Sequence, residues 1–220
     1  MSNSSSSVPL FTGLSKDAIS FILSAAVRRK YPAGRLIVAA DHRAQSLYLL
    51  HSGAVGYVVH CRGERETLIR RFLHGDAFGV ASLFAEPVGY LGSARAIRDS
   101  VLFVWDHVTA RRLAKLHPRL VENALQIALR YVASYSKRHL RLLCDSAEGR
   151  LAATLTSLGS RIGKHLPNGL DVNVKNEELA SLADVSPFTA SRILRAWERH
   201  GAIRKKRGHV IVQAPEKLFG

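Results

Sequence analysis

Residues 176–199 read NEELASLADVSPFTASRILRAWER and decide the C-terminal fold. Apolar residues recur at three- and four-residue spacing in two runs, which predicts two short helices joined by a tight turn. Asn176 is the expected N-cap of the first helix. Ser186 is the expected cap of the second helix, with Pro187 at its first helical position. Two short helices joined in this way are typical of a helix-turn-helix.

The second of these helices combines an apolar face with a polar and basic one. Its remaining surface carries Thr189, Ser191, Arg192, Arg195 and Arg199. Between residues 187 and 209 the chain has seven Arg or Lys residues and a single acid. A short helix with a polar start and a basic flank suits the DNA major groove. A three-helix packing unit with a solvated basic face is the alternative.

Residues 202–212 predict a β-hairpin directly after this helix. Two short apolar runs flank a basic turn with Gly208, and the turn is longer than the two-residue kind. A hairpin in this place would be a wing. It would bring Arg204, Lys205, Lys206 and Arg207 near phosphates, so the wing and the charge together favour DNA as the partner.

The composition of the whole chain agrees with such a partner. The 220 residues have a hydrophobic content of 47% and a formal net charge of +15. This length accommodates one large domain or two small ones. The charge predicts a polyanionic partner, most simply nucleic acid, although an anionic membrane surface would select the same composition. No apolar run approaches the roughly 20 residues of a spanning helix, so no membrane partner is expected.

The N-terminus and the cysteines predict a cytoplasmic protein. Residues 1–8 form a Ser-rich tail without the pattern of a secretory signal, and we expect this tail to be disordered. Cys61 and Cys144 are the two cysteines of the chain. Two cysteines so far apart favour reduced thiols, and they are too few for an iron–sulfur cluster.

Residues 9–108 predict an antiparallel β-barrel or jelly roll. A helical pattern from Pro9 to Lys30 comes first, and residues 31–34 (Tyr-Pro-Ala-Gly) end it. Short β-rich runs separated by glycine turns follow, which is typical of such a barrel. The runs cover residues 36–38, 46–50, 55–59, 66–69, 94–97 and 101–105.

Residues 109–144 predict a long helix. Its apolar residues alternate by four and three positions, as in a coiled-coil seam, so two copies of the chain are expected to pair along it. A single amphipathic helix packed on the barrel is the alternative. The expected seam residues are Val121, Leu125, Ala128, Val132, Tyr135, His139 and Leu142. Asp145-Ser146 would then be a hinge to the winged helix-turn-helix domain at residues 145–220.

This order of elements resembles the Crp/Fnr superfamily of bacterial transcription regulators. The residues that carry the resemblance are Pro32-Ala33-Gly34, Gly53, Gly75-Asp76-Ala77-Phe78-Gly79 and Ser191-Arg192. The resemblance implies an α+β protein with an N-terminal antiparallel β-barrel or jelly roll acting as a sensor, a long dimerisation helix and a C-terminal winged helix-turn-helix. It also implies a homodimer on a two-fold symmetric operator in double-stranded DNA, with RNA polymerase as a further partner if the protein is an activator.

The stretch that binds cyclic AMP in relatives departs from its pattern here. Val80 stands where the ribose-binding Glu is expected, and Tyr90-Leu91 stand where the phosphate-binding Arg-Ser pair is expected. Losing a guanidinium fork removes the main charge-assisted contact to a phosphate, so cyclic AMP is not the expected effector. The resemblance places the effector pocket at Gly79, Val80, Ser82, Tyr90, Leu91, Tyr135 and Ser136.

The sequence does not name a cofactor. Haem stays open, because some gas-sensing relatives bind it and several histidines could serve as ligands. The candidates are His42, His51, His60, His74, His107, His117 and His139, with His74 and His139 first. A metal enzyme on a cupin-like barrel is a further alternative, but the histidines lack its His-x-His spacing, so neither a catalytic residue nor a metal site is expected.

The recognition helix also departs from the pattern of its relatives. Many of them read DNA with Glu, Ser and Arg, and Phe188 here occupies the Glu position. Arg192 can still contact a guanine edge bidentately, and the Phe188 ring can touch a thymine methyl. The resemblance implies phosphate contacts for Asn176 and Thr189. The expected DNA-contact residues are Asn176, Ser186, Phe188, Thr189, Ser191, Arg192, Arg195, Lys205, Lys206 and Arg207. A C-terminal domain that binds protein instead of DNA is the remaining alternative.

Overall fold

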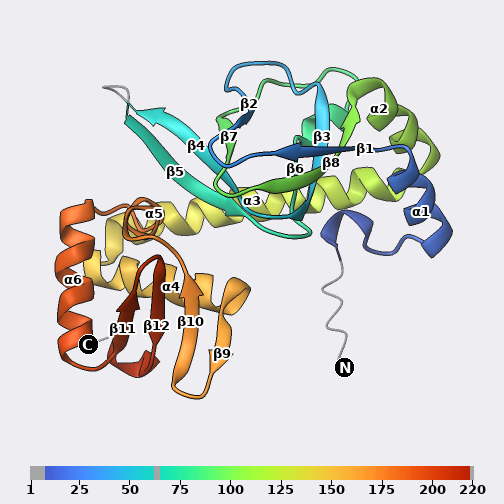
Figure 1. Cartoon of the computed structure of the whole chain (residues 1–220). Coiled ribbons are helices and arrows are strands. Elements are labelled where there is room, and N and C mark those ends of the chain that lie inside the picture. The colour runs from blue at the N-terminus through green and yellow to red at the C-terminus, as the bar shows by residue number, and fades with distance from the viewer. Residues whose placement is uncertain (1–7, 62–64, 219–220) are drawn as a thin grey trace. The chain divides into compact units, whose positions relative to one another are not determined.

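The computed structural model describes residues 8–61 and 65–218. Residues 1–7, most of the expected tail, lie outside the described residues, as does the side chain of Cys61. The chain forms two compact units, Met1–Ser134 and Tyr135–Gly220 (Figure 1).

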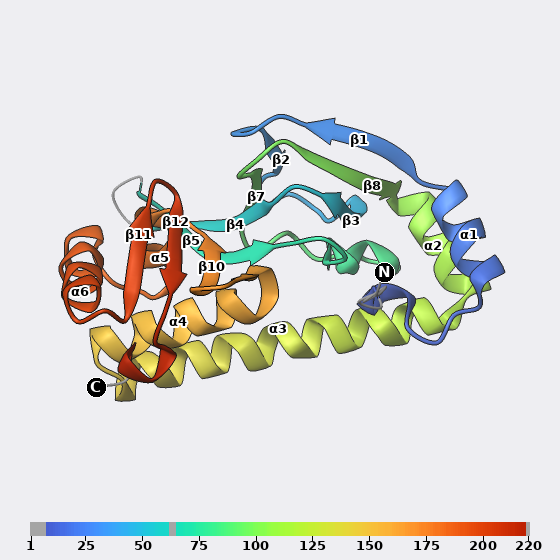
Figure 2. The same ribbon diagram turned by 60° about the horizontal axis from the view of Figure 1, so that its bottom comes forward.

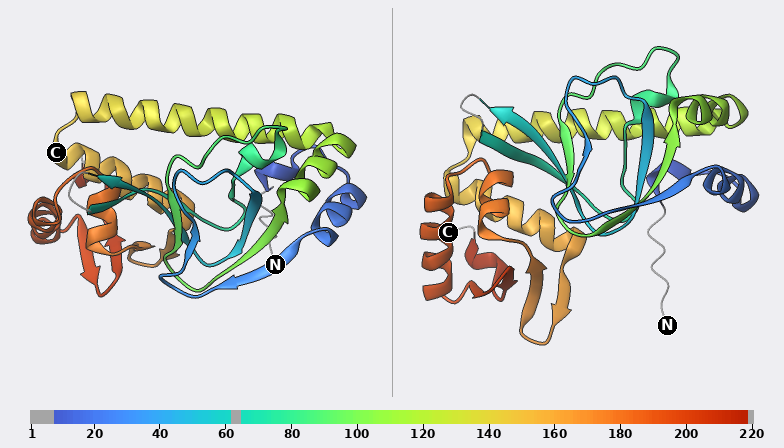
Figure 3. Two further views of the ribbon diagram at one scale, coloured as in Figure 1. Left: turned by 90° about the horizontal axis from the view of Figure 1, so that it is seen from above. Right: turned by 45° about the horizontal axis from the view of Figure 1, so that its top comes forward.

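The first unit contains two four-stranded sheets with antiparallel pairing. Its strands are β1 (Val27–Tyr31), β2 (Leu36–Val38), β3 (Ser46–Ser52), β4 (Val55–Cys61), β5 (Arg65–Phe72), β6 (Ala77–Phe78), β7 (Ser93–Ala96) and β8 (Ser100–Asp106). The strand orders are β1-β8-β3-β6 and β2-β7-β4-β5. Figure 3 shows the long β4–β5 hairpin and the strands around it. The predicted antiparallel β fold of this unit is confirmed.

Apolar side chains from both sheets share one core. Alternate residues of β8, such as Leu102 and Val104, are buried in it, as the two-residue period of a strand requires. The rings of Tyr48, Phe78 and Phe72 stack in sequence, with centroids 4.8 and 4.9 Å apart. This aromatic stack fills the space between the sheets.

Helices cover the other side of the β1-β8-β3-β6 sheet. They are the 3-10 helices η1 (Pro9–Phe11) and η2 (Val80–Leu83), with α1 (Lys16–Ser24), α2 (His107–Leu116) and the first part of α3 (Pro118–Cys144). α1 and α2 lie side by side (Figures 1 and 2). The indole N–H of Trp105 donates to the carbonyl of Ile22 at 2.7 Å, which joins the sheet to α1.

Two helices end earlier than the sequence predicts. The expected helix from Pro9 to Lys30 stops at Ser24, because residues from Val27 onwards pair with β8 as an edge strand. The range 109–144 contains two helices instead of one. α2 ends before His117, whose non-helical backbone reflects the clash of a helical residue with a following proline, and Pro118 begins α3.

The second unit is a winged helix-turn-helix, as predicted. Its elements are α4 (Ala147–Ile162), β9 (Lys164–Leu166), β10 (Gly169–Asn173), α5 (Asn176–Leu182), α6 (Pro187–Arg199), β11 (Ile203–Lys206), β12 (His209–Val212) and η3 (Pro215–Leu218). The strands form one sheet in the order β11-β12-β10-β9. Its core contains Leu155, Leu179, Leu194 and Trp197.

Two local predictions in this unit are wrong. Asn176 does not cap α5, because it is already the first helical residue and Lys175 occupies the cap position without a side-chain bond. The wing has a two-residue loop, because Lys206 pairs with His209 and leaves Arg207 and Gly208 between the strands. Gly208 has a φ of 75°, which a glycine adopts without strain.

Within residues 8–61 and 65–218, none of the helices combines the length and the apolar character that crossing a bilayer requires.

Asp106 caps α2 and supplies a test of the fold. The Thr109 N–H donates to its carboxylate at 2.7 Å, and this bond lowers the pKa of Asp106. Such a carboxylate stabilises the fold above its unfolded pKa, about 4, and this contribution is lost as the pH falls through the folded pKa. Asp106→Ala should lower the free energy of unfolding by about 1 kcal/mol. Asp106→Asn should keep most of the cap at pH 7, and its stability should fall less than that of the wild type when the pH is lowered. Urea unfolding at pH 7 and at a pH below the folded pKa of Asp106 measures this. An Asn variant as acid-sensitive as the wild type would contradict this.

Candidate nucleic-acid interface and effector region

α6 presents one face to the core and the opposite face to solvent. Ala190, Ile193, Leu194 and Trp197 are buried at helical spacing. The hydroxyl of Ser186 accepts the Thr189 N–H at 3.0 Å, which confirms the predicted N-cap. The start of this helix is therefore fixed by its own sequence.

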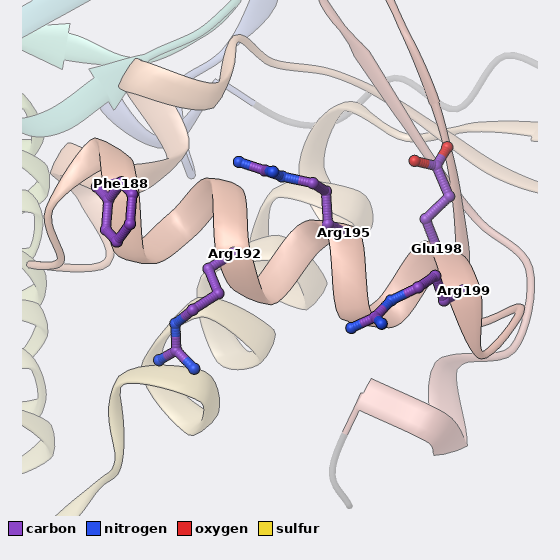
Figure 4. Close-up of a pocket in the computed structure, with 5 residues that line it drawn as sticks. All are labelled: Phe188, Arg192, Arg195, Glu198 and Arg199. Atoms are coloured by element: carbon purple, nitrogen blue, oxygen red, sulfur yellow. The ribbon is translucent and has the colours of Figure 1, made fainter.

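The exposed face of α6 is basic and carries one large aromatic ring. Phe188, Arg192, Arg195, Glu198 and Arg199 line a shallow groove along the helix. Figure 4 shows their side chains projecting from successive turns, with Phe188 at the N-terminal end. Phe188 is 77% exposed, so its ring is available to a ligand outside the protein.

Arg192 and Arg195 differ in their local contacts. The Nε of Arg195 donates to the carbonyl of Ser191 at 3.3 Å. Within the described part of the chain, the Arg192 guanidinium makes neither a hydrogen bond nor an ion pair. Arg192 is thus available to a ligand outside the protein.

The wing extends the basic surface beyond the helix. Arg204, Lys206 and Arg207 are exposed and Lys205 is half-buried. Glu198, the acid on α6, accepts the backbone N–H of Lys205 at 2.8 Å and so ties the wing to the helix. This role of Glu198 was not predicted, because it depends on where the hairpin returns.

The remaining predicted DNA contacts lie around the start of α6. The hydroxyl groups of Ser186 and Thr189 are 2.8 Å apart and bond to each other. Ser191 and Asn176 are partly buried, on α6 and at the first residue of α5. At the far end, the Trp197 indole donates to Glu148 at 2.8 Å and joins α6 to α4.

The predicted effector residues of the first unit lie around η2 and the loop that precedes β7. Gly79 has a φ of 72°, and a Cβ there would lie 2.2 Å from the carbonyl oxygen of Ser46, so the turn requires glycine. Val80 packs partly against the core, and Ser82 is buried with its hydroxyl donating to Gly79 at 2.8 Å. Tyr135 and Ser136 belong to the second unit.

Tyr90 and Leu91 differ sharply in their surroundings. The Tyr90 hydroxyl donates to the carbonyl of Ser46 at 3.3 Å. Burial and the neighbouring Tyr48 raise the pKa of Tyr90 above its ordinary range, so its hydroxyl stays a neutral donor. Leu91 is exposed. Arg95, the nearest arginine in sequence, is engaged by Glu66 at 3.0 Å and by the carbonyl of Gly34 at 2.9 Å.

The predicted seam residues on α3 do not share one environment. Val121 packs partly against the core of the first unit, and Ala128 and Tyr135 are half-buried. The other members, Leu125, Val132, His139 and Leu142, are exposed. Three further large apolar residues of α3 are also exposed, namely Leu129, Leu140 and Leu143.

The candidate haem histidines are distributed over both units. The Nδ1 of His74 lies 2.6 Å from the carbonyl oxygen of His51, and that of His107 lies 2.9 Å from the carbonyl oxygen of Ser82. His60 pairs with Glu66. Among the described residues, the imidazoles of His42, His117 and His139 make neither a hydrogen bond nor an ion pair. In the two described ranges, no three His, Cys, Asp or Glu side chains gather as a metal ion would require.

Comparisons with known proteins identify both parts of the chain. Residues 28–117 match the cyclic nucleotide-binding domain, and residues 149–219 match the Crp-like helix-turn-helix domain. The chain is 31% identical over 208 residues to the cyclic AMP receptor protein of Thermus thermophilus, covering 93% of this chain and 92% of that protein. It is 25% identical over 211 residues to a CRP-like cAMP-activated global transcriptional regulator of Mycobacterium tuberculosis, covering 95% and 94%.

A solved structure has the same architecture. The c-di-GMP responsive global regulator CLP of Xanthomonas campestris superimposes with a TM-score of 0.77 at 22% identity, covering 90% of this chain and 99% of that one. With the two domain matches and the Thermus relative, the chain belongs to the Crp/Fnr superfamily of DNA-binding transcription regulators.

Proposed function

We propose that this regulator acts as a homodimer on a two-fold symmetric operator, with cyclic AMP not its effector. The exposed apolar row on α3 supports the homodimer. Leu125, Leu129, Val132, Leu140 and Leu143 are each about half exposed or more, and they recur at three- and four-residue spacing when Ser136 is included. A soluble chain rarely exposes such a row unless a partner covers it. A second copy would bury it as a coiled-coil seam.

The seam proposed from the exposed row differs from the seam predicted from the sequence. Leu125, Val132 and His139 remain in register with it, whereas Val121 faces the core of its own unit. The register therefore runs through Leu129 instead of Ala128. Such a dimer would present two copies of α6 to two half-sites about one helical turn apart.

Each half-site would be read by the exposed face of α6. Arg192 would contact a guanine edge and Phe188 a thymine methyl. Asn176, Ser186, Thr189, Ser191 and Arg195 would position the helix on the backbone, and Lys205, Lys206 and Arg207 of the wing would meet phosphates. Acting at a promoter in the cytoplasm, the dimer would meet RNA polymerase if it activates.

Independence from cyclic AMP is supported by the residues around β7. Tyr90 and Leu91 supply neither a positive charge nor two adjacent hydrogen-bond donors for a phosphate. The Arg95 guanidinium already forms an ion pair with Glu66. Among the relatives, the Thermus and Mycobacterium proteins are named for cyclic AMP and the Xanthomonas regulator for cyclic di-GMP. The nucleotide thus differs between proteins of this architecture.

Selection of duplex DNA from a random pool, with and without cyclic AMP, tests both parts. We expect a two-fold symmetric site with a guanine in each half-site, and equal affinity for it under the two conditions. Enrichment that requires cyclic AMP would overturn the proposed independence from cyclic AMP. A site without symmetry would overturn the proposed homodimer.

Phe188 should set one position of that site. We expect wild-type protein to prefer thymine or to be relaxed there, because a phenyl ring can touch a methyl group but accepts no hydrogen bond. Phe188→Glu should shift the preference to cytosine, because the cytosine amino group can donate a hydrogen bond to the glutamate carboxylate. Repeating the selection measures this. Val88→Glu, an apolar-to-acid change at a similarly exposed residue of the first unit, is the matched control and should leave the site unchanged. An identical site for Phe188→Glu would contradict the assignment.

A further inference from the structure

The turn between α5 and α6 is held by an arginine from α3. Nε and Nη2 of Arg138 donate to the two carboxylate oxygens of Asp184, and Nη2 also donates to the carbonyl of Ser181 at 3.0 Å. The side chains of Arg138 and Asp184 are only 20% and 21% exposed. A bidentate pair in partly buried surroundings is among the stronger charge-assisted contacts and fixes orientation as well as distance.

A second arginine holds the backbone of the same turn. Arg150 of α4 donates to the carbonyls of Ala183 at 3.1 Å and Asp184 at 3.2 Å. It also donates to the carbonyl of Asp145, in the connection between α3 and α4, at 2.9 Å. Ser181 lies in the last turn of α5, and Ala183 and Asp184 follow its end, where carbonyls lack the partners that a continuing helix would supply. The arginine contacts satisfy these carbonyls and complement the helix dipole.

Asp184 occupies a backbone conformation that few residues adopt. Its φ is 54°, in the left-handed region, where aspartate is tolerated better than most side chains but less well than glycine. Glycine would make the turn without strain but could not bind Arg138. Asp184 lies two residues before the Ser186 cap, so its conformation sets the direction in which the chain enters α6.

We infer that Arg138 is a positioning residue for DNA recognition. Through Asp184 it fixes the direction in which α6 leaves the turn, and hence the placement of Phe188 and Arg192, without itself contacting DNA. Arg138 lies on α3, the helix that carries the exposed apolar row. The ion pair therefore connects the turn before the recognition helix to the helix proposed to pair two copies.

A double-mutant cycle on the full-length protein tests this inference. Arg138→Gln and Asp184→Asn should each weaken binding to the selected duplex about tenfold, the loss expected for one strong charge-assisted contact. The double variant should be no weaker than either single variant, because both remove the same contact. Losses that multiply to about a hundredfold, or single variants with wild-type affinity, would overturn the inference.

Three controls separate positioning from other roles. Arg141→Gln removes the same charge from an exposed site on α3 and should leave the affinity within about twofold. The salt dependence of binding should be unchanged in Arg138→Gln, whereas a slope lower by about one would mean that Arg138 contacts phosphate and would overturn the inference. Asp184→Gly suits the backbone without a carboxylate and should weaken binding as Asp184→Asn does; wild-type affinity would show that the carboxylate is not needed.

Hydrogen exchange measured without DNA tests the inference apart from the proposed operator. Amides of residues 185–190 should exchange faster in Arg138→Gln and Asp184→Asn than in the wild type, while those of β10 should not change. Unaltered exchange at residues 185–190 would overturn the positioning role. Failure of the wild-type protein to select a symmetric site would instead count against the dimer proposal.

Discussion

Leu129→Asp should convert the dimer to a monomer and weaken operator binding by about a hundredfold, the lower end of the gain from linking two binding modules. Leu129 is 52% exposed on α3, so an aspartate there leaves the core of the first unit intact. In a paired seam, however, two copies of the new carboxylate would face each other across apolar side chains, where charge is costly. Sedimentation measures the mass and fluorescence anisotropy measures the affinity.

Ser134→Asp is the matched control for this change. Ser134 is exposed on the same helix, five residues beyond Leu129 and therefore about 140° around the axis from it. It places the same carboxylate outside the apolar row and should leave both the mass and the affinity unchanged. A Leu129→Asp protein that stays dimeric and binds the operator fully would rule out this seam.

Local signals predicted the fold well where a segment determines its own structure. The apolar periodicity of α6, its Ser186 cap and Pro187 predicted the helix and its first residue correctly. Local signals did not predict β1, because its own sequence does not determine its structure. Four of its five residues are exposed, so it has no alternating burial pattern, and pairing with β8 is what makes it a strand. Its basic residues continue the helical pattern before it.

In the candidate site, too, local features were predictable and contacts between distant residues were not. The basic and polar surface of α6 was predictable, because exposure on a helix follows from spacing. The contact between Glu198 and Lys205, and that between Arg138 and Asp184, were not. The second joins residues 46 positions apart, one on α3 and one in the turn between α5 and α6, and neither residue type signals a partner by itself. The change of the proposed seam from Ala128 to Leu129 also needed the structure, since only it shows which side of α3 the first unit covers.

Arg192→Gln should abolish the preference for guanine and weaken binding about tenfold for each half-site, hence about a hundredfold for the symmetric operator. Its guanidinium projects from α6 and is unengaged within the described residues (Figure 4). It can therefore donate to both O6 and N7 of guanine, whereas the shorter glutamine pairs better with adenine. Titrating the operator against a duplex with that guanine replaced measures the discrimination directly.

Comparison with Arg204→Gln distinguishes a base-specific contact from a phosphate contact. Arg204 is an exposed arginine of the wing, so its loss should weaken binding to all duplexes alike and lower the salt slope by about one. Arg192→Gln should do the reverse, with a large loss of discrimination and a smaller change in slope. If both variants lower affinity uniformly, Arg192 contacts phosphate, and sequence must be read by other residues of α6. If Arg192→Gln alone loses the guanine preference, the guanidinium is the group that specifies the half-site.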